Sequence, residues 1–166
     1  MRLRLSSPDE PGDRRCINAF LERDFSGSGN RCEEVGPQWA IARFDFTADC
    51  LRPGGIISGP TVFGVCDAAL YYACFTAIGI EPMALTSELS IRFMRPARGD
   101  VLRARADLHQ VGRRSIIGSV VAWTDDIHKP VAVAQGTYVR PLESPVEPVV
   151  DPTVGSIASD DANSPS

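Results

Sequence analysis

Asp67 is the residue of this sequence that most directly indicates chemistry. It is the only charged residue between Thr61 and Ile80, in a stretch that is otherwise mostly apolar. Burying an ionised carboxylate is costly unless it is solvated or hydrogen-bonded. One interpretation makes Asp67 the N-cap of a helix that starts at Ala68, leaving 61–66 as a strand. The other places the carboxylate in a buried cleft, where restricted water suits a general base or a nucleophile.

The preceding segment Ser58-Gly59-Pro60 favours the second interpretation, because it is a helix-start signal. A serine or glycine N-cap with proline in the first turn predicts a helix over 60–78 that ends at Gly79 and carries Asp67. The unpaired N–H groups and positive dipole end of such a first turn can also stabilise the oxyanion of a thioester. Simple capping is the plainer interpretation of Ser58, and the two roles are compatible.

Arginines form the third group of candidates. Three of them surround Pro96, namely Arg92, Arg95 and Arg98, and Arg113 and Arg114 follow Gly112 in a predicted turn. Guanidinium groups in such clusters can hold the phosphates of a ligand that carries a nucleotide. The alternative, which is the more common case on strand faces, is a solvated surface arginine.

The sequence lacks the motifs of other common kinds of catalytic or nucleotide-binding site. The sequence has no P-loop, no G-x-G-x-x-G and no G-x-S-x-G motif. His109 and His128 are single histidines on a predicted strand and loop, where a solvated or structural role is expected. We therefore expect no metal site and no cofactor of the protein's own.

The elements that must position these residues form a simple order. The segment 38–46 predicts a strand, and the helix over 60–78 is apolar nearly all round, as a helix wrapped by other structure would be. Strands with a period of two follow over 85–94, from Val101, over 115–123 and over 130–139. In the first of them, residue 85 and every second residue after it are expected on one face, and Thr86 on the other. One antiparallel sheet curling around one helix, an α+β fold, satisfies this order.

Composition narrows the class of protein. The chain has 166 residues, a net charge of -4 and a pI of about 5.2, which argues against a nucleic-acid or anionic-membrane binder. The apolar stretch around Asp67 is better explained as a core helix than as a membrane span. Five cysteines at irregular spacing are expected to be reduced thiols in a cytoplasmic protein, and the N-terminus lacks the apolar region of a secretory signal.

Three regions are predicted along the chain. Residues 1–35 are expected to be an extension of loop with a short helix at the apolar patch 17–21. The domain itself is expected over 36–142. Residues 143–166, rich in proline, serine and aspartate, predict a flexible acidic tail.

The motifs together resemble a family. The run SGPTVFGVCDAALYYA at 58–73 is similar to the helix-start motif H-G-G-x-x-x-x-L-x-D of PaaI-type acyl-CoA thioesterases of the hotdog superfamily. The stretch 84–114 resembles that family's following strand with its Pro-Ala and Gly-Arg turns, and 132–139 resembles its closing strand. The resemblance implies a curved antiparallel sheet around one long helix, with active sites between the subunits of a homodimer or homotetramer.

The resemblance also implies roles for residues in the hydrolysis of an acyl-CoA thioester. Asp67 would activate water, the Gly59 N–H would polarise the carbonyl, and Thr86 would come from the facing strand of the partner subunit. The Gly112-Arg113 turn would lie toward the nucleotide of coenzyme A, and Arg95 and Pro60 are further candidates for contact with it.

The sequence departs from the family motif at three positions. Ser58 replaces the histidine, Pro60 replaces the second glycine and has no N–H to donate, and Arg52 replaces a frequent asparagine. These changes leave a second function open, a non-catalytic acyl-CoA-binding protein that acts as a sensor or carrier. A hotdog dehydratase ranks last, because neither histidine lies near the helix start.

Overall fold

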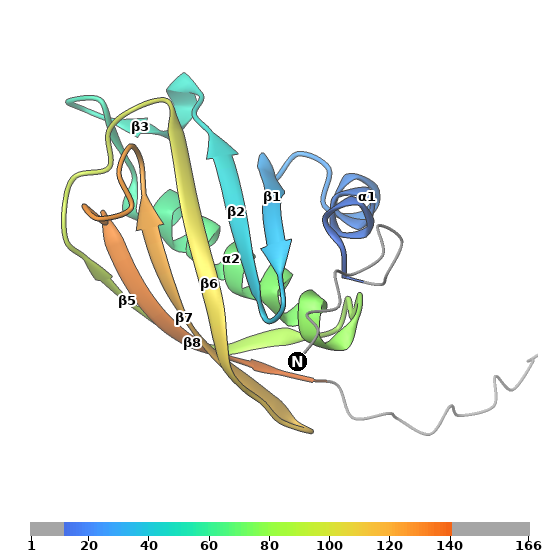
Figure 1. Cartoon of the computed structure of the whole chain (residues 1–166). Coiled ribbons are helices and arrows are strands. Elements are labelled where there is room, and N and C mark those ends of the chain that lie inside the picture. The colour runs from blue at the N-terminus through green and yellow to red at the C-terminus, as the bar shows by residue number, and fades with distance from the viewer. Residues whose placement is uncertain (1–11, 141–166) are drawn as a thin grey trace, which may run out of the picture.

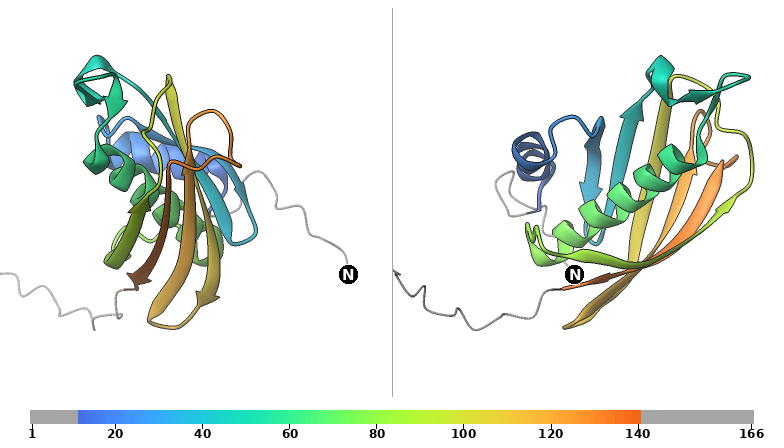
Figure 2. Two further views of the ribbon diagram at one scale, coloured as in Figure 1. Left: turned by 90° about the vertical axis from the view of Figure 1, so that its left-hand side faces the viewer. Right: turned by 180° about the vertical axis from the view of Figure 1, so that it is seen from behind.

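One antiparallel sheet wraps a single long helix in the computed structural model of the protein, which describes residues 12–140 (Figure 1). The sheet has six strands in the order β1-β2-β6-β7-β8-β5, and α2 crosses its concave face (Figure 2). The elements are α1 (Arg14–Asp24), β1 (Asn30–Gly36), β2 (Trp39–Asp45), a 3-10 turn η1 (Ala48–Cys50), β3 (Leu51–Arg52), β4 (Ile56–Ile57), α2 (Gly59–Ile78), β5 (Leu85–Phe93), β6 (Val101–Val111), β7 (Ser115–Trp123) and β8 (Ala132–Val139). The predicted α+β class is confirmed.

The local signals around α2 act as predicted. The Ser58 side chain accepts from the Thr61 N–H as the N-cap, Pro60 lies in the first turn, and Gly79 ends the helix with a φ of 81°. The alternative in which a helix starts at Ala68 is therefore wrong. By length and composition α2 could cross a membrane, but half of it is buried inside this fold, as in the core helix of a soluble protein.

Small residues under α2 let the helix lie directly on the sheet. The inward positions of β2 and β6 include Ala40, Ala42, Ala104 and Ala106, all fully buried. Gly118 of β7 and Gly136 of β8 pair directly. A Cβ on Gly118 would come within 3 Å of one methyl group of Leu70, and a Cβ on Gly136 within 3 Å of the other. The glycine pair is thus a notch for Leu70, whose burial contributes about 1.5–3 kcal/mol.

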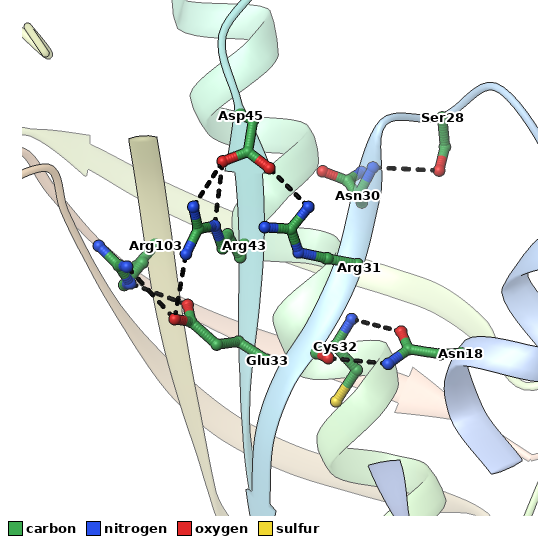
Figure 3. Close-up of polar contacts among 9 residues, drawn as sticks. All are labelled: Asn18, Ser28, Asn30, Arg31, Cys32, Glu33, Arg43, Asp45 and Arg103. Carbon is green, nitrogen blue, oxygen red and sulfur yellow. Dashed lines mark hydrogen bonds and ion pairs between the residues drawn. The ribbon is translucent and has the colours of Figure 1, made fainter. Parts of the chain in front are cut away.

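The sheet begins earlier in the chain than the predicted boundary at residue 36. β1 lies within the range expected as an extension, and α1 covers the apolar patch at 17–21. Asn18 of α1 both donates to the Cys32 carbonyl and accepts from its N–H, which ties the helix to β1 (Figure 3). The predicted tail at 143–166 lies outside the described residues, and the domain bounds stay a prediction.

A charge network covers the outer face of β1, β2 and β6 (Figure 3). Arg43 and Arg103 are directly opposite across two strands, a pairing of like charges that is destabilising by itself. Glu33 bonds Arg103 at 2.8 Å and approaches Arg43 at 3.5 Å, while Asp45 bonds Arg43 at 2.8 Å. Such partly exposed pairs add little to stability, but they offset the repulsion on this face.

A β-bulge in β5 changes the predicted side-chain pattern at the start of that strand. The register against β8 shifts between Thr86 and Glu88, so Thr86 lies opposite Tyr138 and shares its face. Leu85, expected on the same face as Leu89 and Ile91, is 55% exposed. Farther along, Leu89 and Ile91 share one face as predicted, and both pack against the core. The expected alternation, with Leu89 on one face and Thr86 on the other, is therefore wrong at the start of β5, because one extra residue reverses it.

Candidate active site

The carboxylate of Asp67 accepts two hydrogen bonds at the same oxygen. The Thr86 hydroxyl donates to Oδ1 at 2.7 Å, and the Tyr138 hydroxyl donates to it at 2.8 Å. No described residue bonds the second oxygen, Oδ2. Asp67 is partly buried on α2, so its charge is held by these two donors while one oxygen remains available to a ligand or water.

The two hydroxyls come from strands that pair with one another. Thr86 of β5 and Tyr138 of β8 are direct partners in the register, and both face the helix. The bulge after Thr86 makes this possible, since regular alternation with Leu89 on the core face would turn Thr86 outward. The resemblance placed a Thr86 from the partner subunit beside the acid; here Thr86 of the same chain bonds it.

Tyr138 is the site residue that the sequence reasoning missed. Its side chain is buried, and burial together with the neighbouring Asp67 carboxylate raises the pKa of Tyr138 far above that of an ordinary phenol. It therefore stays protonated and acts as a donor. The signal was available in the alternation of 132–139, which puts Tyr138 on the core face, where a tyrosine hydroxyl needs a polar partner.

A small aromatic pocket adjoins Asp67. It has a volume of about 170 Å³, and its lining includes Asp67, Tyr71, Tyr138 and, from the N-terminal segment, Leu21 and Phe25. Tyr71 stacks on Tyr138 with the ring centroids 5.7 Å apart. The pocket therefore joins a carboxylate to an apolar space.

The cysteine next to Asp67 in the sequence is unsuited to nucleophilic chemistry. Burial raises the pKa of the Cys66 thiol to about 12, with a smaller contribution from the Asp67 charge. A thiol with this pKa is not ionised near neutral pH. Asp67 is thus the reactive group that α2 offers.

The start of α2 forms a different part of the surface. The Ser58 hydroxyl lies 2.7 Å from that of Thr61, and its oxygen also caps the helix, so both interactions of Ser58 are local. Gly59 is the first helical residue, and its N–H has no partner within the helix. Gly59, Arg52, Phe93 and Arg95 line a groove of about 530 Å³.

Within one chain the predicted site residues fall into two groups. Gly59 precedes Asp67 by eight residues, which is about 12 Å along the helix. Arg95 lies with Gly59, Ser58 and Pro60 at the start of α2, whereas the turn of Gly112 and Arg113 lies at the Asp67 end. This follows from the register, in which Ile116, just after that turn, pairs with Tyr138. The chain thus brings Asp67 together with Thr86 but not with Gly59.

The class of hotdog-fold proteins is defined by a curved antiparallel sheet around a buried helix, and this chain has that fold. In this chain a carboxylate of that helix also lines a pocket. The sequence comparisons agree, since residues 54–131 match the family model of the thioesterase superfamily. A Saccharolobus solfataricus protein, provisionally named an esterase, is 27% identical over 125 residues, which are 74% of this chain and 82% of that protein.

Solved structures lead to the same superfamily. A provisionally assigned thioesterase from Silicibacter superposes with a TM-score of 0.71 at 29% identity, covering 78% of this chain and 92% of that one. The Escherichia coli PaaI protein from the phenylacetic acid degradation operon shares the fold, with a TM-score of 0.65 at 24% identity over 74% of this chain and 88% of its own. The chain therefore has the hotdog fold, and its residues 54–131 are similar to the thioesterase superfamily. These relatives support thioester hydrolysis in general.

Proposed function

We propose that the protein hydrolyses acyl-CoA thioesters, with Asp67 as the general base. The observation that carries the proposal is the double hydrogen bond at Asp67 Oδ1, which fixes the carboxylate and leaves Oδ2 without a hydrogen bond from any described residue. Asp67 itself lines the pocket. Oδ2 takes a proton from water as the water oxygen bonds to the thioester carbon. The C–S bond then breaks, the leaving thiolate takes the proton from Asp67, and the products are the free acid and coenzyme A.

The oxyanion donor in this proposal is the Gly59 N–H of a second copy of the chain. Because Gly59 and Asp67 are about 12 Å apart along one helix, one carbonyl group cannot reach both within a subunit. A site that uses both groups therefore needs two subunits. The smallest assembly that supplies them is a homodimer.

The free edge of β5 supports a dimer of this kind. β5 is the last strand of the sheet, and large apolar side chains at its two ends are exposed: Met83 60%, Leu85 55%, Phe93 55% and Met94 52%. An uncovered edge strand of nine residues, with exposed apolar side chains at both ends, favours pairing with another strand. A two-fold axis at the middle of β5 makes that pairing antiparallel and exchanges the strand's ends.

That exchange would assemble the missing site. Thr86 and Asp67 lie at the beginning of β5, while Phe93 at its end lies against Gly59, with 3.6 Å between the ring and an ideal Cβ at Gly59. Antiparallel pairing therefore carries the Gly59 end of one subunit toward the Asp67 end of the other. Arg95 of one chain and Arg113 of the other would then flank the same substrate and contact the phosphates of coenzyme A.

The test is steady-state hydrolysis of a panel of acyl-CoA thioesters, with release of free thiol as the readout. We expect the wild type to turn over and Asp67→Asn to lose about 10²- to 10⁴-fold in kcat. Asp49→Asn, a surface substitution of the same chemistry, is the matched control and should keep full activity. Acyl-pantetheine thioesters, which lack the nucleotide, should show a higher KM than the CoA thioesters.

Two results would contradict the proposal. Equal turnover by the wild type and Asp67→Asn at equal purity removes Asp67 from the mechanism. Absence of turnover by the wild type, together with thermal stabilisation by acyl-CoA, would instead favour the acyl-CoA-binding protein. The capping role of Ser58, which leaves no imidazole at the helix start, is the observation that favours this second candidate.

A further inference from the structure

We propose that Phe25 sets the length of the acyl group that the protein accepts, an inference that rests on the proposed thioesterase function. Phe25 follows α1 in the N-terminal segment, outside the residues that match the superfamily. Its side chain reaches the pocket of Asp67. The size limit of the substrate would thus come from a segment that lies outside the matched residues 54–131.

The pocket beside Asp67 has the chemistry of an acyl site. Its walls carry the rings of Phe25, Tyr71, Tyr72 and Tyr138, while Asp67 supplies the one charged group. Apolar lining with a few polar groups is the usual composition of a small-molecule site. An acyl tail in this pocket keeps its carbonyl carbon at the Asp67 end, where the attacking water is activated.

The volume of the pocket limits what it can take. At about 170 Å³ it is only slightly larger than a cavity of about 150 Å³ that accommodates one benzene molecule. We therefore expect an acyl tail of roughly six carbon atoms or fewer to fit, and longer straight chains to collide with the wall.

Phe25 stands between this pocket and a second hollow. A neighbouring hollow of about 250 Å³ lies over the end of α1 and the glycine-containing loop after it. The two spaces share four lining residues, Leu21, Phe25, Ser28 and Asn30. These side chains form the partition, and Phe25 has the largest of them.

Phe25 can also be changed at lower cost to the fold than Leu21. Leu21 belongs to the buried core, whereas Phe25 is 46% exposed. Its ring packs edge-on against Phe20 and Tyr71, with centroids 5.6 and 6.3 Å away. Its backbone N–H caps α1 by donating to the Leu21 carbonyl, an interaction that a side-chain substitution leaves in place.

The experiment compares wild type, Phe25→Ala and Phe25→Trp on butanoyl-, hexanoyl-, octanoyl- and decanoyl-CoA. A single extra methylene in an apolar pocket changes kcat/KM by about 10- to 200-fold. We expect Phe25→Ala to raise the octanoyl-to-butanoyl ratio of kcat/KM by about tenfold or more, and Phe25→Trp to lower it. Ile127→Ala, which removes an exposed apolar side chain from the loop before β8, is the matched control and should leave the ratio unchanged.

A binding measurement separates this inference from the proposed function. The same acyl-CoAs are titrated calorimetrically into Asp67→Asn with and without each Phe25 substitution, and melting temperatures check that each variant is folded. Phe25→Leu replaces Phe25→Ala if the latter does not fold. Unchanged length ratios in both assays overturn the role of Phe25 while Asp67-dependent turnover still stands. Shifted binding ratios without any turnover sustain the role of Phe25 and overturn the thioesterase.

Discussion

The hydroxyl of Tyr138 lies 2.8 Å from Oδ1 of Asp67, although 71 positions separate the two residues in the chain. Thr86 donates to the same oxygen, so the carboxylate is held from two neighbouring strands. Hydrogen bonds to a charged acceptor are stronger than neutral ones and fix its orientation. The geometry of Asp67 therefore depends on the sheet as well as on the helix that carries it.

Replacing Tyr138 by phenylalanine should weaken catalysis more than substrate binding. The substitution removes one of the two donors, so the carboxylate is less well oriented, and we expect kcat to fall about tenfold with KM nearly constant. The free energy of unfolding should fall by about 1–2 kcal/mol because a hydrogen bond to a charged group is lost. Steady-state kinetics and thermal melts measure both effects. Thr86→Ser, which keeps its hydroxyl, should behave like the wild type; a large rise in KM for Tyr138→Phe would instead indicate a contact with substrate.

Replacing Gly59 by proline should remove the proposed oxyanion donor without disturbing the helix. Proline is favoured at the first helical position, and Ser58 before it is already extended, with φ -66° and ψ 147°. We expect a loss in kcat of about 10²- to 10³-fold.

Mixing Gly59→Pro with Asp67→Asn then tests whether the site spans two subunits. Random pairing gives half heterodimers, each with one intact site of two, so activity should return to about a quarter of wild type. No recovery in mixtures that have been shown to exchange subunits would place both groups within one chain.

Replacing Ser58 by alanine should affect stability and not turnover. The side chain caps α2 through the Thr61 N–H at 3.3 Å, and loss of such a cap costs about 1 kcal/mol. Chemical denaturation provides the measurement, with Ser58→Gly as a control that should cost only a few tenths of that amount. A collapse of kcat in Ser58→Ala at preserved stability would show that the serine acts on substrate.

Stability should fall at alkaline pH because of the buried thiols of α2. Burial raises the pKa of Cys66 and Cys74 from 9.0 to about 12, so the folded protein keeps protons that the unfolded chain releases. This contribution is complete below pH 9 and is lost progressively between pH 9 and pH 12, by about 1.4 kcal/mol per thiol at pH 10. Urea unfolding at several pH values measures the slope. Cys66→Ala should flatten it, and an identical slope in that variant would contradict the assignment.

Local signals in the sequence determined the central helix. Ser58 and Pro60 fix where it starts and Gly79 where it ends, because capping and backbone preferences act over a few neighbouring residues. Asp67 could also be identified from its neighbours in the sequence, because it is the single charge in an apolar stretch. The period of two from Val101 onward also predicted the strand β6, whose residues alternate in burial, since alternation is a property of the extended chain itself.

Tertiary structure decided what surrounds Asp67. The bulge that turns Thr86 inward, the pairing of Thr86 with Tyr138, and the approach of Phe25 from the end of α1 depend on register and packing between distant segments. A register shift of one residue reverses the face of every side chain beyond it, and no local preference of the residues around Thr86 specifies that shift. The sequence therefore determined the candidate acid, while the folded sheet selected its partners and the shape of its pocket.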